Sequence, residues 1–269
     1  MPDVSVNGIR LHYVETGQGP ETVVFSHSYL VDHRHFEAQI AGLADGYRVL
    51  AYDHRDHGGS ERMTRPYGME DIYADGVAFL EAVAPKPCHW VGLSTGGFVG
   101  LRLAIRRPDR LRSLVVMGSA GDAEPWPNRV KYGLLLAVVR FVGFGPVLGE
   151  AMKAMFGRKT LQDPERRDFR TLWRQRLTAN GRRAVVRFGR AIFRRDSVEE
   201  QLGSIRVPTL VARGDQDRAV SEERARRTAD AIPGARYRTL PGAGHLSTLE
   251  RPDLVTEMLR EHLDGILEI

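Results

Sequence analysis

The sequence of 269 residues contains a single cysteine, Cys88, and no long uninterrupted hydrophobic run. One cysteine excludes an intramolecular disulfide framework as the basis of the fold. The most apolar stretch, residues 132–148, is broken by Arg140, Gly143, Gly145 and Pro146, which a bilayer-spanning helix would not carry together. The first residues also lack a basic segment followed by an apolar one. We therefore expect a cytoplasmic protein without a membrane span.

Low-complexity tracts and internal repeats are also missing from the sequence. Its 42% hydrophobic and 27% charged residues are ordinary for a globular protein. A chain of this length can bury one large core, so a mainly disordered protein is excluded.

Charge is the unbalanced property of this chain, with a net charge of +5. Residues 122–205 hold 17 Lys and Arg against 9 Asp and Glu, whereas the rest of the chain holds 22 against 25. The basic side chains of this segment alternate with apolar ones at helical spacing, which is typical of solvated helix faces. We therefore expect no nucleic-acid partner.

Short apolar runs recur before and after this basic segment. Asn7-Gly8 separates residues 4–6 from residues 11–16 and predicts an antiparallel hairpin. Six further runs are typical of strands buried on both faces: residues 22–26, 48–52, 89–93, 111–117, 208–213 and 236–240. Helical patterns separate most of them: residues 36–43, 69–84, 97–107, 222–231 and 252–266. This alternation predicts an α/β fold with a mostly parallel eight-stranded sheet flanked by helices.

The basic segment interrupts the alternation because it contains no convincing strand. Its candidate helices cover residues 129–142, 147–156, 164–178 and 182–194. The segment follows the sixth strand, so we expect a helical cap over the carboxyl ends of the strands, where open α/β sheets bind ligands. The predicted organisation is a core of residues 1–121 and 206–269 with a cap of residues 122–205.

The motif Gly92-Leu93-Ser94-Thr95-Gly96 stands directly between a predicted strand and a predicted helix. Small residues on both sides of Ser94 allow a sharp turn that exposes its hydroxyl above the sheet. The alternative is a glycine-rich turn that only packs a helix against a strand. The strand before the motif and the helix after it favour a nucleophile elbow.

A serine hydroxyl needs a general base, and the base needs an acid that orients it. His245 follows the last predicted strand, and Asp217 follows the strand before it. We expect these two residues to serve as base and orienting acid. Asp215 and Asp122 remain alternatives for the acid, and the two that are not used would be turn formers.

The oxyanion of an acyl-transfer reaction needs two hydrogen-bond donors held in place. One should be the backbone N–H of Thr95, directly after the nucleophile. The other should come from the loop after residues 22–26, and we assign it to the backbone N–H of Tyr29.

Taken together, these motifs resemble the α/β-hydrolase superfamily from Val23 to about Leu263. The matching segments are residues 53–60, the elbow, Gly214 with Asp217, and residues 243–245, and the chain order serine, aspartate, histidine is the one found in that superfamily. Ser28-Tyr29 and residues 245–248 are similar to the branch of 3-oxoadipate enol-lactonases and non-haem haloperoxidases and esterases.

Two positions depart from the superfamily pattern. The usual His-Gly of the oxyanion loop is His27-Ser28 here, and the usual Arg-Gly-His-Gly is Arg55-Asp56-His57-Gly58. We expect Asp56 to adopt positive φ only at some energetic cost.

The resemblance implies a serine hydrolase of carboxylic esters or lactones that works through an acyl-Ser94 intermediate. A serine at this position argues against haloalkane dehalogenase and epoxide hydrolase chemistry, which the resemblance associates with an aspartate nucleophile. Hydrolysis of a carbon–carbon bond, perhydrolysis, and a small-molecule receptor that retains the triad stay open as alternatives.

The predicted substrate pocket combines the oxyanion loop with apolar side chains of the cap. Its residues are His27, Ser28, Trp126, Leu135, Phe141 and Phe156. The alternative is that the apolar ones pack the cap onto the sheet. Arginines of the cap would favour a substrate carboxylate, as an enol-lactone presents.

Five histidines gather in the sequence near the predicted pocket, together with Asp32 and Asp53. They are His27, His33, His35, His54 and His57. Because they belong to different loops and no pair has the spacing of a helical metal site, we expect no metal and no cofactor.

Overall fold

The computed structural model describes residues 2–267, and the predicted strands form one sheet in the order β1-β2-β4-β3-β5-β6-β7-β8. The strands are β1 (Asp3–Val6), β2 (Ile9–Thr16), β3 (Thr22–Ser26), β4 (Arg48–Tyr52), β5 (Cys88–Leu93), β6 (Leu111–Met117), β7 (Thr209–Gly214) and β8 (Arg236–Leu240). β2 pairs antiparallel with β1 and β4, and all other pairs are parallel. The prediction of a mostly parallel eight-stranded sheet is confirmed.

The strands of the antiparallel hairpin and the central parallel strands differ in burial, as the sequence indicates. Asn7 and Gly8 join β1 to β2 with φ values of 51° and 74°, which an Asn-Gly hairpin turn favours. Every residue of β5 and β7 is buried because helices cover both faces of the sheet. These mostly apolar runs form the centre of the core.

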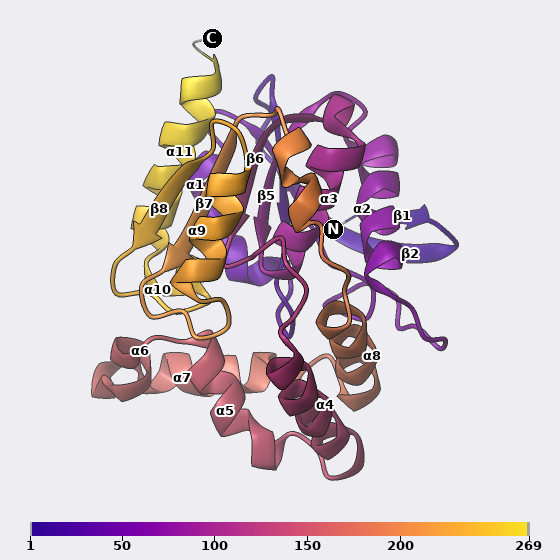
Figure 1. The fold of residues 1–269 in the computed structure, drawn as a ribbon, viewed down its shortest axis with the longest axis vertical. Helices are drawn as coiled ribbons and strands as arrows, with labels where there is room; N and C mark the ends of the chain where they lie inside the picture. The colour runs from indigo at the N-terminus through magenta and orange to yellow at the C-terminus, as the bar shows by residue number, and fades with distance from the viewer. Residues whose placement is uncertain (1, 268–269) are drawn as a thin grey trace.

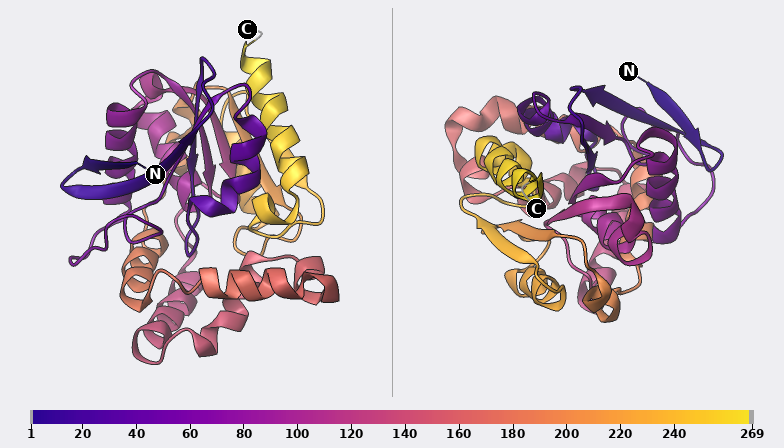
Figure 2. Two further views of the ribbon diagram at one scale, coloured as in Figure 1. Left: turned by 180° about the vertical axis from the view of Figure 1, so that it is seen from behind. Right: turned by 90° about the horizontal axis from the view of Figure 1, so that it is seen from above.

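Helices cover the sheet on both sides (Figures 1 and 2). α1 (Glu37–Leu43) and α11 (Pro252–Leu267) pack together on one face. α2 (Met69–Val83), α3 (Thr95–Arg106) and α9 (Glu222–Ala231) lie on the other. The short α10 (Ser247–Glu250), between β8 and α11, was not predicted.

Five further helices follow β6 and precede β7, where the sequence predicts an insertion. They are α4 (Trp126–Phe141), α5 (Gly145–Met155), α6 (Arg158–Gln162), α7 (Arg167–Arg176) and α8 (Arg182–Phe193). We refer to these five helices as the helical layer. Figure 1 shows the helical layer across one end of the sheet, the end toward which β7 and β8 point.

Hydrogen bonds join the helical layer and the short segment between α5 and α6 to loops that follow the strands and to α10, on two sides. On the α8 side, Tyr29 Oη donates to the carbonyl of Val185 over 2.8 Å. On the α6 side, the Gly157 N–H donates to the Glu250 carboxylate over 2.9 Å, and the Arg158 N–H donates to Gln216 Oε1 over 2.7 Å. The layer is therefore held at both ends.

Asp56 supplies a further connection at the position where the sequence departs from the superfamily pattern. Its φ is 66°, the strained value that was expected of a non-glycine residue here. The Asp56 carboxylate accepts hydrogen bonds from Arg187 of α8 and from Tyr67. Burial would raise the pKa of Asp56, but these hydrogen bonds hold it below its usual range. The aspartate thus ties α8 to the loop after β4, which a glycine would not do.

No helix within residues 2–267 combines the length and the apolar character that crossing a membrane requires.

Candidate active site

Ser94 occupies the turn between β5 and α3 in a conformation that side chains rarely adopt. Its φ is 54° and its ψ is −107°. The Ser94 N–H donates to the carbonyl of Met117 over 2.8 Å, and Ser119 Oγ donates to the carbonyl of Ser94 over 2.7 Å. Contacts on both sides of the residue therefore maintain the strained turn.

Two glycines of the motif are required by close backbone approach. A Cβ at Gly92 would lie 2.2 Å from the backbone of Gly96. A Cβ at Gly96 would lie 1.9 Å from the carbonyl oxygen of Ser26, in β3. No side chain fits at either position, so the glycines allow β5, α3 and β3 to meet where Ser94 is presented.

His245 and Asp217 meet beside this turn. His245 Nδ1 lies 2.9 Å from Asp217 Oδ2, and both side chains are buried. The other carboxylate oxygen, Asp217 Oδ1, accepts the N–H groups of Ala219 and Val220 over 2.8 and 3.1 Å. Both carboxylate oxygens of Asp217 thus have hydrogen-bond partners, and the imidazole of His245 is held in one orientation.

The two alternative acids lie elsewhere. Asp215 Oδ1 accepts the N–H of Gly242 over 2.8 Å, which is a turn-stabilising contact. Asp122 forms ion pairs with Arg224 and Arg227 of α9. The structure therefore brings His245 together with Asp217 and with neither of the other two.

Gly118 is a neighbour of the pair that sequence reasoning missed. A Cβ on this residue would lie 3.1 Å from both Asp217 Oδ2 and His245 Nδ1, and its φ is 51°. Its position directly after β6, at the same edge of the sheet as Ser94, was the available signal.

Two backbone N–H groups near Ser94 have no hydrogen-bond acceptor within residues 2–267. One belongs to Thr95, the first residue of α3, whose N–H is among those a helix start leaves free. The other belongs to Tyr29, whose ring is fixed by the bond from its hydroxyl to Val185. These are the two groups that the sequence predicts as donors to an oxyanion, and this role stays a prediction.

Ser94 and His245 line a common cavity of about 320 Å³ between the sheet and the helical layer. Its walls are mainly apolar and come largely from α4, α5 and the segment between them, with further side chains from α3, α8 and the segment after β7. The principal apolar side chains from this part are Leu135, Leu136, Val139, Phe144, Val147 and Leu148. Such a cavity suits the hydrocarbon part of a small molecule.

Of the six side chains predicted for the pocket, only Leu135 lines this cavity. Trp126 and Phe141 lie on the outer face of α4 and are 74% and 76% exposed. Phe156 is buried against Phe169 of α7. For Trp126 and Phe141 the prediction was wrong because α4 carries apolar residues on two faces, and periodicity does not say which face meets the cavity. Tyr132 and Phe193 line it and were missed.

The two oxyanion-loop residues predicted for the pocket, His27 and Ser28, are also absent from the cavity wall. Both are buried behind it. His27 Nε2 accepts the N–H of His54 over 2.8 Å, and His27 Nδ1 lies 2.7 Å from the carbonyl of Ser28. Burial lowers the pKa of His27, so this imidazole is a neutral structural link between two loops.

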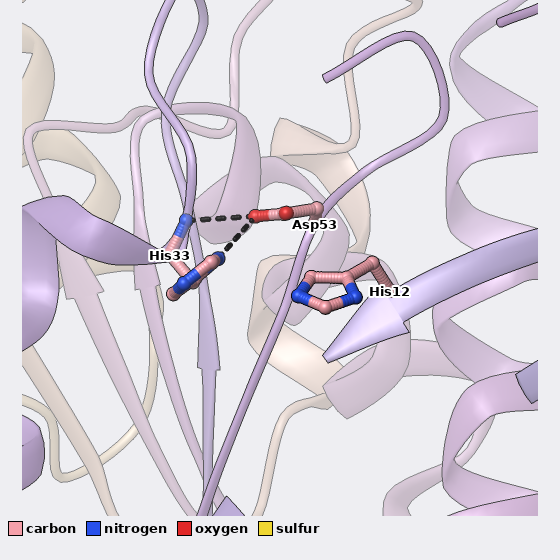
Figure 3. A group of neighbouring side chains, drawn as sticks. All are labelled: His12, His33 and Asp53. Atoms are coloured by element: carbon pink, nitrogen blue, oxygen red, sulfur yellow. Dashed lines mark hydrogen bonds and ion pairs between the residues drawn. The ribbon is translucent and has the colours of Figure 1, made fainter. Parts of the chain in front are cut away.

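His12, His33 and Asp53 form a cluster (Figure 3), and none of the three lines this cavity. Their candidate ligand atoms lie within 4.8 Å of one another, a set whose chemistry suits Zn²⁺. Sequence reasoning missed it because His12 comes from β2, far from the loops that were considered. Asp53 Oδ1 accepts hydrogen bonds from the backbone and ring of His33, and Asp53 Oδ2 accepts one from the Gly59 N–H. These bonds alone give Asp53 a structural role.

The His33–Asp53 pair should make stability depend on pH. Burial would lower the pKa of His33, but the hydrogen bond from its ring to Asp53 raises it overall. Burial would likewise raise the pKa of Asp53, and the same bond lowers it overall. The stabilisation is therefore complete between the ordinary pKa values of about 4 and 6.5. It is lost as pH rises through the raised pKa of His33 or falls through the lowered pKa of Asp53.

We expect His33→Asn to lower the free energy of unfolding by about 1 kcal/mol near pH 6, or roughly 3 °C in Tm. The difference from the wild type should shrink by pH 9, where the wild-type imidazole is neutral. Thermal melts from pH 5 to 9 measure it. A difference that stays constant across this range would contradict the assignment of an ion pair.

Comparisons with known proteins place these features in context. The alpha/beta hydrolase fold family matches residues 21–252. The chain is 28% identical to 3-oxoadipate enol-lactonase 2 of Acinetobacter baylyi over 254 residues, which cover 93% of the chain and 91% of that protein. It is 27% identical to a putative carbamate hydrolase, RutD, of a Caulobacter species over 277 residues, with 98% and 99% covered.

Solved structures of enzymes are also similar to this chain over nearly its whole length. The structure of an enol-lactonase from Burkholderia xenovorans superposes with a TM-score of 0.89 at 28% identity and covers 98% of this chain and 100% of that one. A second match is Est816, described as an N-acyl homoserine lactone degrading enzyme. It has a TM-score of 0.82 at 27% identity, with 97% and 99% covered.

Proposed function

Since the chain belongs to the alpha/beta hydrolase fold family, we propose that it is a serine hydrolase of carboxylic esters or lactones. The observation that carries the proposal is the 2.9 Å contact between His245 and Asp217 beside the cavity that Ser94 lines. The names of two similar proteins, an enol-lactonase and a lactone-degrading enzyme, support the choice of substrate class.

In the first half of the proposed reaction, His245 removes the proton from Ser94 Oγ. The serine oxygen attacks the substrate carbonyl, and the N–H groups of Thr95 and Tyr29 bind the oxyanion that forms. Asp217 keeps the Nδ1 proton of His245 in place, so Nε2 is free to act as the base. His245 then gives its proton to the leaving alkoxide, and an acyl ester of Ser94 remains.

In the second half, water takes the place of the alcohol. His245 removes a proton from the water, and the resulting hydroxide attacks the acyl carbonyl at the same oxyanion site. The carboxylic acid leaves as Ser94 recovers its proton from His245. For a lactone, the hydroxyl and the acid belong to one product molecule.

The helical layer serves as a cap in this mechanism. It closes the cavity over Ser94 with apolar walls, which bind the hydrocarbon part of the acyl group or ring and reduce the access of water. The core of residues 1–121 and 206–269 would carry the catalytic groups, and residues 122–205 would shape the substrate.

A serine-directed phosphonate tests the proposal on the intact protein. We expect one adduct per chain, located at Ser94 by peptide mass spectrometry and missing from Ser94→Ala. Ser204→Ala is the matched control, because this exposed serine donates only to the carbonyl of Gln201. The same preparation should hydrolyse members of a panel of p-nitrophenyl esters and lactones.

Two results would reject the proposal. One is the absence of an adduct at Ser94. The other is an adduct without turnover of any ester or lactone, which would favour a ligand-binding protein that retains the three residues.

A further inference from the structure

A second hollow, of about 520 Å³, lies beside the cavity that Ser94 lines. It is formed mainly by α5, α6 and α7, and we refer to it as the basic groove. Six cationic side chains line it, and no carboxylate of the described part of the chain does. They are Lys153, Arg158, Arg167, Arg170, Arg174 and Arg218.

Most of these cations lack a partner. Within residues 2–267, no carboxylate or carbonyl accepts a hydrogen bond from the guanidinium groups of Arg158, Arg167, Arg174 or Arg218. Only two of the six are engaged: Lys153 pairs with Glu150, and Arg170 donates to the carbonyls of Thr160 and Asp163.

Arg187 and Arg195 of the same segment are both neutralised by carboxylates, Asp56 and Glu124. Within the groove, four guanidinium groups without a partner in residues 2–267 line one concave surface that holds no carboxylate from this part of the chain. Like charges gathered in a hollow repel one another, and an anion bound among them removes that cost. Guanidinium groups bind carboxylate and phosphate oxygens in pairs, which gives such a site strength and direction.

The basic groove adjoins the candidate active site. Lys153 and Arg218 line both the groove and the cavity of Ser94. Arg158 and Arg218 also border a smaller hollow beside Asp217. The two hollows therefore adjoin at Lys153 and Arg218, the side that a substrate with its carbonyl at Ser94 would have to pass to reach the groove.

We propose that the basic groove binds an oxyanionic group of the substrate that carries at least two negative charges, either a phosphate or a polycarboxylate. This inference rests on the proposed function for the position of the reacting carbonyl. The charge follows from the number of free guanidinium groups, because a single carboxylate engages one of them in a two-point contact and leaves the others unpaired. The substrate is then an anionic ester or lactone with an apolar acyl part.

Binding of simple anions tests the groove independently of hydrolysis. Pyrophosphate and citrate should bind the intact protein with dissociation constants below about 1 mM at low salt, and acetate more weakly. In the double variant Arg158→Gln/Arg174→Gln, their affinity should fall about 10-fold or more. Neither residue belongs to the proposed catalytic machinery. Isothermal titration calorimetry measures both effects.

The matched control is Arg183→Gln/Arg190→Gln in α8. Both arginines are exposed, lie outside the groove and change the net charge by the same amount. Equal losses in the two double variants would show only a general effect of charge and would overturn the assignment. The absence of binding by either probe would overturn it as well.

Kinetics then connect the groove to the substrate. We compare p-nitrophenyl butyrate with p-nitrophenyl esters whose acyl chains end in a phosphate or in two carboxylates. The wild type should hydrolyse the charged esters with a higher kcat/KM than the neutral one. In Arg158→Gln/Arg174→Gln, the groove variant, this preference should fall about 10-fold, while kcat/KM for the neutral ester should stay unchanged. The better of the two charged esters identifies the oxyanion.

The outcomes separate the two proposals. Anion binding that depends on Arg158 and Arg174, without turnover of any ester, supports the groove and rejects the proposed function. Turnover without a preference for charged esters, or a preference that survives in the groove variant, rejects the groove as a substrate site and leaves the hydrolase assignment standing.

Discussion

Asp217→Asn should lower kcat for an ester about 10⁴-fold while the protein remains folded. The reason lies in the two hydrogen bonds that Asp217 Oδ1 accepts from the N–H groups of Ala219 and Val220. These donors would hold the amide oxygen of asparagine in the same place, so its NH₂ group would face His245 Nδ1. The imidazole would then carry its proton on Nε2 and be unable to take the proton of Ser94.

The two alternative acids provide matched controls for this experiment. Asp215→Asn and Asp122→Asn each remove one carboxylate near the same edge of the sheet, but neither carboxylate contacts His245. Their kcat values should stay within about 10-fold of the wild type. A larger loss in Asp215→Asn than in Asp217→Asn, with both variants folded by circular dichroism, would contradict the assignment.

Gly96→Ala should have the largest effect on stability, a loss of more than about 3 kcal/mol. The added Cβ would lie 1.9 Å from the carbonyl oxygen of Ser26, and the contact is with backbone at the centre of the sheet. β3 has little room to yield, because Ser26 Oγ is itself held by Tyr52 and His54. Urea unfolding, monitored by circular dichroism, measures the loss.

Gly133→Ala is the control for this substitution. Gly133 lies within α4, and a Cβ at this position would meet nothing within 4 Å. Alanine should therefore stabilise the helix, by up to about 1 kcal/mol. Equal stability of the two variants would show that α3 can move away from β3 and that the tight turn does not depend on glycine.

The strands could be predicted from the sequence because the centre of the sheet is buried on both sides. β5 and β7 are mostly apolar runs, and the Asn7-Gly8 turn has a chemical signature of its own. Ser94 could also be identified from the sequence, because a turn this tight requires small residues on both sides of the serine. Asp217 and His245 follow adjacent strands, so the topology itself brings them close.

The helical layer could be predicted only in outline. Its helices are amphipathic or apolar on more than one side, so their sequences do not say which side faces the cavity. Leu135 and Trp126 illustrate this, since both belong to α4 and only Leu135 points inward. The cluster of His12 with Asp53 was also missed, because its members are brought together by pairing between β2 and β4 that no local pattern records.

The contacts that hold the helical layer at both ends have a consequence for exchanging parts between related enzymes. Tyr29, Asp56, Gln216 and Glu250 belong to four separate segments of the rest of the chain, and each bonds to the layer. A chimera that grafts only the inserted helices onto another scaffold would leave their partners behind. Transplanting substrate preference therefore requires moving these four anchor positions together with the helices.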